Sequence, residues 1–180
     1  MKKMLFGLLL GWVCAWSAQA ATIEFAATLT PDQEVPPVVG SSGSGTAALV
    51  LDTDTGNLGW VVSFEGLTSN VIAAHFHKAP VGEDGPVQVD LVPLDLFGGA
   101  SALGRTAGIF AGGISGAALA PAMLADLMAG LWYLNIHTVD HPGGEIRGQV
   151  LNGTFNPVPI PAAAWLMVPA LGVLGWRRRG

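Results

Sequence analysis

Apolar residues recur at every second position in several segments between residues 22 and 152, and this pattern limits the folds that the chain can adopt. In residues 58–64, for example, Trp60, Val62 and Phe64 fall on one side of an extended strand. Gly, Pro, Asp and Asn separate these segments, as in the turn predicted at residues 54–57. A period of two is typical of antiparallel strands with one buried face, so we expect a mostly β chain.

The pattern predicts one helix and seven strands. The helix is expected at residues 121–129, where Pro121 suits the first turn and Gly130 ends the helix. Residues 98–116 are rich in Gly and Ala and show no clear period. Seven short strands with turns at this spacing predict an antiparallel β-sandwich or a Greek-key-like barrel. The strands are expected at residues 22–29, 46–51, 58–64, 71–77, 87–92, 131–138 and 145–152.

The first twenty residues have the three parts of a secretory signal peptide. Lys2 and Lys3 precede fifteen apolar residues, and small residues follow at Ala18 and Ala20. The alternative is an uncleaved N-terminal membrane helix, but fifteen apolar residues are short for a hydrocarbon core of about 30 Å, and the small residues favour cleavage. We therefore expect export across the inner membrane and cleavage by signal peptidase after Ala20. The only cysteine, Cys14, lies in this segment, so the mature chain is expected to lack disulfides and thiolate metal sites.

The last residues form a spacer, an apolar stretch and a basic end. A proline-rich spacer is followed by fifteen mostly apolar residues at 162–176 and then by three arginines. This arrangement resembles the PEP-CTERM sorting signal, although Ile160 stands where the namesake motif has Glu. The resemblance implies a transient inner-membrane anchor, processing by an exosortase-like enzyme, and delivery to the cell surface or extracellular matrix. A plain membrane anchor is the alternative. The residues that carry the signal are Val158, Pro159, Pro161, Arg177, Arg178 and Arg179.

Between these ends, residues 21–157 are predicted to be a single domain with a strongly acidic balance. Residues 21–157 contain three basic residues and all thirteen acidic residues of the chain, so their formal charge is −10. Such a charge disfavours binding to nucleic acid and anionic membranes, and suits cations or basic partners. The alternative is an acidic surface that keeps an exported protein soluble.

All four histidines lie in two short segments of this domain. His75 and His77 project from one face of a predicted strand, opposite Ile72, Ala74 and Phe76, which are expected to join the core. On a later strand, the same alternation places Tyr133, Asn135 and His137 opposite Trp132, Leu134 and Ile136. If the two strands are neighbours, three imidazoles converge into a site for one copper or zinc ion, and Glu145, Asp140 or His141 could supply a further ligand or a partner that orients one. The alternative is a set of structural histidines that form hydrogen bonds with neighbouring loops.

Several ordered motifs resemble the CHRD domain over about residues 23–152. They read FAATLTPDQEVPP at 25–37, GL at 66–67, AAHFH at 73–77, GPV at 85–87, WYLNIHT at 132–138 and PGGEIRGQ at 142–149. The family takes its name from chordin, an animal extracellular antagonist of bone morphogenetic proteins. For a chain with a bacterial-type export signal, the resemblance implies a secreted β-domain and not growth-factor binding.

Three functions remain open at this point. The first is an extracellular domain with a binding or structural role, whose partner is a polysaccharide or a protein. The second is a metal-binding protein that uses the histidines. The third is an enzyme similar to Cu/Zn superoxide dismutases, which Gly66-Leu67 before His75-Phe76-His77 resembles. The chain lacks a phosphate-binding loop, a dinucleotide fingerprint and a nucleophile elbow, so we do not expect an enzyme.

Overall fold

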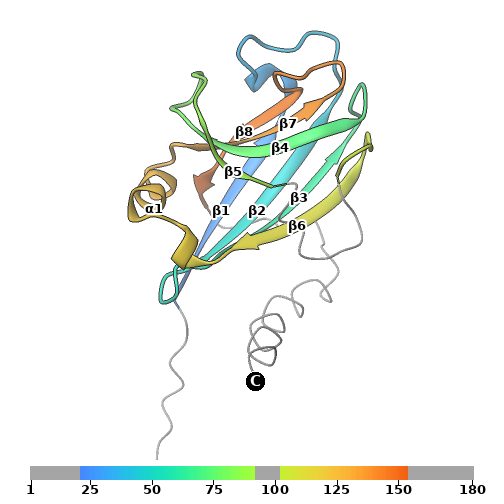
Figure 1. Cartoon of the computed structure of the whole chain (residues 1–180). Helices are drawn as coiled ribbons and strands as arrows, with labels where there is room; N and C mark the ends of the chain where they lie inside the picture. The colour runs from blue at the N-terminus through green and yellow to red at the C-terminus, as the bar shows by residue number, and fades with distance from the viewer. Residues whose placement is uncertain (1–20, 92–101, 154–180) are drawn as a thin grey trace, which may run out of the picture.

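The computed structural model describes residues 21–91 and 102–153, which fold into two antiparallel sheets packed face to face (Figure 1). The β-sandwich expected from the alternating pattern is therefore confirmed, and the sheets do not close into a barrel within the described residues. Over the same residues, no helix has the length and apolar character that a membrane crossing requires. The predicted signal peptide and sorting signal, including Ala18, Ala20 and residues 158–180, lie outside the described residues.

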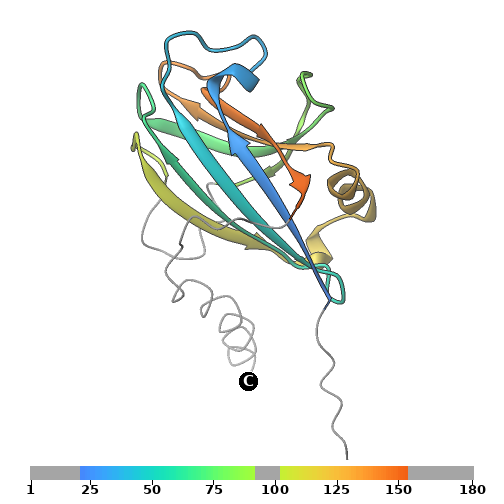
Figure 2. The ribbon, with the colours of Figure 1, turned by 180° about the vertical axis from the view of Figure 1, so that it is seen from behind.

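The larger sheet has five strands in the order β6-β3-β2-β1-β9, and it is seen from behind in Figure 2. The smaller sheet has four strands in the order β5-β4-β7-β8. The strands of the larger sheet are β1 (Thr22–Leu29), β2 (Ser44–Asp52), β3 (Leu58–Glu65), β6 (Gly108–Ile114) and β9 (Leu151–Asn152). Those of the smaller sheet are β4 (Val71–Lys78), β5 (Val87–Asp90), β7 (Trp132–Thr138) and β8 (Ile146–Gln149).

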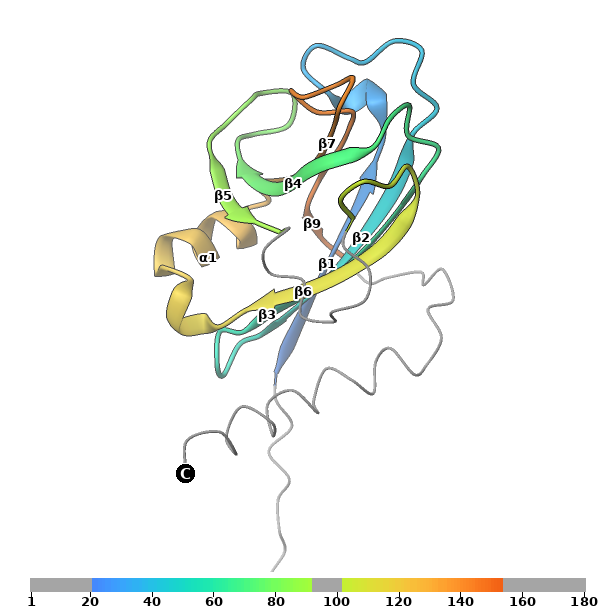
Figure 3. The same ribbon diagram turned by 45° about the vertical axis from the view of Figure 1, so that its right-hand side comes forward.

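The core lies between the two sheets, as Figure 3 shows from the side. Alternate residues of each strand point inward, so Trp60 of β3 in one sheet meets Phe76 of β4 in the other. Their rings are 5.6 Å apart and nearly perpendicular, an arrangement that aromatic pairs favour. A helix, α1 (Pro121–Met128), ends one residue before its predicted end and buries Leu127 in the core.

Two differences from the sequence pattern have clear causes. Strand β6 lies within residues 98–116, where the pattern predicted nothing, because its glycines leave few side chains to show a period. It forms an edge of the larger sheet, pairs with β3 and contributes Phe110 to the core. On β4, the register shifts between Val71 and Ala73, so Ile72 is 45% exposed instead of joining the core.

The outer face of the smaller sheet is also covered, which is unusual for an antiparallel sandwich. All seven residues of β7 are buried, including Tyr133, Asn135 and His137 on the side away from the core. Three connections supply contacts to this face: residues 30–43, residues 79–86 and residues 139–144. The polar residues of the smaller sheet therefore lie in a second buried layer beneath loops.

Candidate metal centre

His75, His77 and His137 lie together on the outer face of the smaller sheet. Strands β4 and β7 are neighbours, with Ala73 opposite His137 and His75 opposite Asn135. This register places His137 diagonally beside His75, within reach of its ring. One nitrogen from each of the three rings lies within 4.8 Å of the other two, and His75 Nδ1 is 3.1 Å from His137 Nε2.

Backbone carbonyls fix the proton positions of two of these rings. His77 Nδ1 donates to the carbonyl of Gly85 at 2.9 Å, and His137 Nδ1 donates to that of Pro142 at 3.0 Å. A carbonyl oxygen only accepts, so in both neutral rings the proton is on Nδ1 and the lone pair is on Nε2. Metal-binding histidines usually have such a partner on the second nitrogen, which fixes the orientation of the ring.

His75 has a different pair of neighbours. Its Nδ1 faces His137, while its Nε2 is 4.0 Å from a carboxylate oxygen of Asp90 on β5. Asp90 lies directly opposite His75 in the ladder between β4 and β5. The His75 side chain is 20% exposed, and the Asp90 side chain is 53% exposed. The cluster is therefore open to solvent on the His75 side.

Burial keeps the two inner rings neutral. It lowers the pKa of His137 to about 4, an effect that the carbonyl of Pro142 opposes and the neighbouring histidines reinforce. Burial likewise lowers the pKa of His77, against the hydrogen bond to Gly85. Neutral imidazoles at pH 7 have a lone pair available for a metal ion.

The spacing of the nitrogens agrees with a metal site. A tetrahedral zinc ion with Zn–N bonds of about 2.0–2.1 Å spaces its ligand nitrogens about 3.3 Å apart. The separation between His75 Nδ1 and His137 Nε2, 3.1 Å, is close to that value, and a bound ion would draw the third nitrogen inward from its position within 4.8 Å of the other two. His77 Nε2 is buried and has no hydrogen-bond partner among the described residues. A buried histidine with a purely structural role would normally form hydrogen bonds through both of its ring nitrogens.

The family comparison agrees with this fold and its motifs. The CHRD domain matches residues 25–150. The chain belongs to the CHRD family. Neither a curated protein nor a solved structure matches the chain. All three clustered histidines of this CHRD domain lie within the matched residues.

Glu145 lies apart from the histidine cluster and has structural partners. Its carboxylate accepts hydrogen bonds from Ser41 Oγ, from the backbone and hydroxyl of Thr68, and from Thr138 Oγ1. Burial opposes its ionisation, but these donors outweigh burial and lower its pKa. The carboxylate therefore joins three segments at one end of the sandwich. His141, the other residue considered as a further ligand, is also outside the cluster of three.

Sequence reasoning missed a set of residues beside the cluster. Arg147, buried on β8, forms an ion pair with the carboxylate of Asp84, in the loop after β4. Tyr133 stacks on His77, with ring centroids 4.9 Å apart and planes 12° from parallel. The alternation of β7 placed Tyr133 and His137 on one face, which was the available signal. No local pattern could pair Arg147 with a residue 63 positions away.

Proposed function

We propose that this CHRD domain is an exported protein that binds one copper or zinc ion through His75, His77 and His137. The observation that carries the proposal is the convergence of three ring nitrogens within 4.8 Å. Two of the rings are already oriented by backbone carbonyls, which is the arrangement expected around a metal ion. The role proposed is binding or structural.

Proton positions at His75 support the same proposal. Without metal, His75 Nδ1 donates to His137 Nε2, since His137 has its own proton on Nδ1. As a ligand, His75 would present Nδ1 to the metal and carry its single proton on Nε2 instead, directed toward the side of Asp90. The Asp90 carboxylate would then stabilise the required tautomer.

The ligand chemistry limits the choice of metal. Three neutral imidazoles suit zinc and copper, whereas calcium and magnesium prefer oxygen ligands. In direct competition, the Irving–Williams order favours copper(II) over zinc. A fourth position would lie on the solvent side, near His75, where water or an external ligand has access.

The test is metal stoichiometry in the full-length protein. We expect about one copper or zinc per chain by mass spectrometry after incubation with either salt, and a higher Tm with metal. The double variant His75→Ala/His77→Ala should lose both the metal and the shift in Tm. His141→Ala is the matched control, because it removes a histidine outside the cluster, and it should behave like the wild type.

Two results would contradict the proposal. One is a wild-type protein that takes up no copper or zinc, and the other is a double variant that retains the wild-type stoichiometry. Export is tested separately, by fractionation of cells that produce the full-length chain. A protein that stays in the cytoplasm with residues 1–20 attached would argue against the exported state.

A further inference from the structure

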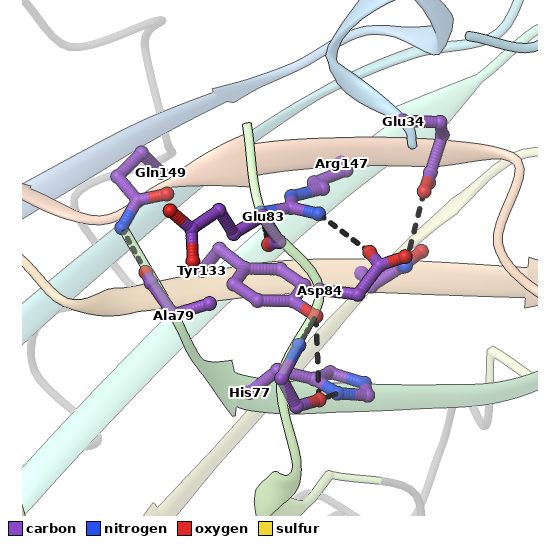
Figure 4. Close-up of polar contacts among 10 residues, drawn as sticks. Glu34, His77, Ala79, Glu83, Asp84, Tyr133, Arg147 and Gln149 are labelled. Carbon is purple, nitrogen blue, oxygen red and sulfur yellow. Dashed lines mark hydrogen bonds and ion pairs between the residues drawn. The ribbon is translucent and has the colours of Figure 1, made fainter. Parts of the chain in front are cut away.

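We infer that Arg147 is a positioning residue for His77: it holds the loop of residues 79–86, called here the covering loop, against the histidine cluster. Arg147 is only 2% exposed, although its main partners belong to a surface loop. Its guanidinium donates to Asp84 Oδ1 at 2.9 Å and to the backbone carbonyl of Glu83 (Figure 4). Two donors directed at adjacent residues fix both the position and the orientation of the loop.

The held loop makes direct contact with His77. Gly85 follows the two residues bound by Arg147, and its carbonyl accepts the Nδ1 proton of His77. The amide of Gly85 donates to the hydroxyl of Tyr133 at 3.1 Å. Displacing the loop would therefore remove the acceptor that fixes the His77 tautomer and leaves the lone pair on Nε2.

A second connection runs through the stacked rings. The guanidinium carbon of Arg147 lies 3.5 Å from the centroid of the Tyr133 ring, on which His77 also stacks. Figure 4 shows Arg147, Tyr133 and His77 side by side beneath the covering loop. The cation–π contact and the ring stack restrict tilting of the His77 imidazole. The hydrogen bond to the loop carbonyl restricts rotation of the imidazole within its own plane.

Backbone hydrogen bonds hold the covering loop at both ends, from Ala79 to Leu131 and from Lys78 to Pro86, whereas the two residues that Arg147 binds lie at its exposed part. Glu83 and Asp84 are exposed, and the Asp84 side chain is 63% exposed. Gly85 passes so close to β4 that an added Cβ would lie 1.7 Å from the carbonyl oxygen of Lys78. The loop is thus seated tightly at Gly85, and Arg147 fixes the two residues before it.

The consequence for metal binding rests on the proposed function, whereas the positioning of His77 rests on these contacts alone. With the loop held, His77 is oriented before a metal arrives, and little rotational freedom is lost on binding. With the loop released, His77 can rotate and change tautomer, so metal affinity should fall while the other two ligands remain.

The experiment compares Asp84→Ala with Glu83→Ala in the full-length protein. Both variants remove one exposed negative charge at adjacent positions, but Glu83 contacts Arg147 through its backbone, which Glu83→Ala retains. Direct replacement of buried Arg147 endangers the fold, so its exposed partner is changed instead. Copper(II) and zinc(II) affinities are measured by competition with a chelator, and the copper(II) ligands are counted by electron paramagnetic resonance.

We expect Asp84→Ala to weaken metal binding at least tenfold and to reduce the nitrogen ligands of copper(II) from three to two. Glu83→Ala should stay within twofold of the wild type and keep three nitrogens. Equal affinities and equal spectra for the two variants would overturn the inference. A loss of affinity without a change in ligand number would also overturn it, because that result indicates a charge effect only.

A measurement on metal-free protein separates this inference from the proposed function. Nitrogen NMR of the imidazoles should show His77 with a fixed Nδ1 proton in the wild type and in Glu83→Ala. In Asp84→Ala, the same ring should show mixed tautomers. If the wild type binds no metal, the proposed function fails, and this spectrum alone decides whether Arg147 positions His77. Identical His77 signals in all three proteins would contradict the positioning role.

Discussion

The two faces of strand β7 are both buried, but they are stabilised in different ways. The inner face carries Trp132, Leu134 and Ile136 against the larger sheet. The outer face carries Tyr133, Asn135 and His137 beneath loops. The comparison shows that burial in this protein takes two forms, one provided by a second sheet and the other by loops that supply polar partners.

The energetics of the two layers differ accordingly. Inner side chains gain from any close apolar packing, because the hydrophobic effect has no direction. Outer side chains need a donor or acceptor at a defined position, since a buried polar group without a partner is costly. Gly85, Pro142 and Glu34 provide such groups for His77, His137 and Asn135. The inner layer therefore supplies most of the stability, and the outer layer defines a geometry.

The largest expected effect is on the inner face, from Phe76→Ala. Phe76 is fully buried and contacts the rings of Trp60 and Trp132, so its loss leaves a cavity between the sheets. We expect the free energy of unfolding to fall by about 3–5 kcal/mol in chemical denaturation. Ile72→Ala, on the exposed side of the same strand, should cost less than about 1 kcal/mol. Equal losses would contradict the assignment of the two faces.

A smaller effect is expected on the outer face from Gly85→Ala. The added Cβ meets the backbone carbonyl of Lys78, so the covering loop must shift. We expect a loss of about 2–3 kcal/mol in unfolding free energy, together with weaker copper binding. Gly143→Ala is the matched control, because nothing lies within 4 Å of its added Cβ. If both variants behave like the wild type in calorimetry and metal titration, the loop is not seated as described.

The smallest effect concerns Glu34, a buried carboxylate in the connection of residues 30–43. Burial raises its pKa to about 7, although Arg147 and the hydrogen bond from Asn135 oppose the rise. The unfolded chain releases this proton nearer pH 4.5, so wild-type stability should fall as pH rises from about 4.5 to 7. Glu34→Gln removes this dependence, so the variant should gain stability relative to the wild type as the pH rises from 4.5 to 8.

Denaturation of both proteins at the two pH values checks this difference. His137 titrates over an overlapping range with the opposite sign, because its lowered pKa makes acidification destabilising. That contribution is common to both proteins and cancels in the comparison. If the difference in unfolding free energy between the wild type and Glu34→Gln is the same at both pH values, Glu34 does not titrate in this range.

The alternating pattern of the sequence was enough to predict which residues share a face of a strand. Alternation in residues 132–138 predicted that Tyr133, Asn135 and His137 share the face opposite Trp132, Leu134 and Ile136, and the structure confirms it. The same rule placed His75 and His77 together on one side of β4. It was wrong for Ile72, because a shift in register interrupts the alternation there. Strand β6 was missed, since glycines carry no periodic signal.

Which distant residues meet depends on the way in which the strands and loops come together. The cluster of three histidines requires β4 to pair with β7 in one register, because a shift of one residue would move His137 to the other face. The partner of Arg147 lies in a loop 63 positions earlier in the chain, and its choice depends on how that loop folds over the sheet. Periodicity fixes the face of a side chain because it is a local property of the backbone. Contacts between strands and loops depend instead on pairing, twist and loop conformation, which no single segment contains.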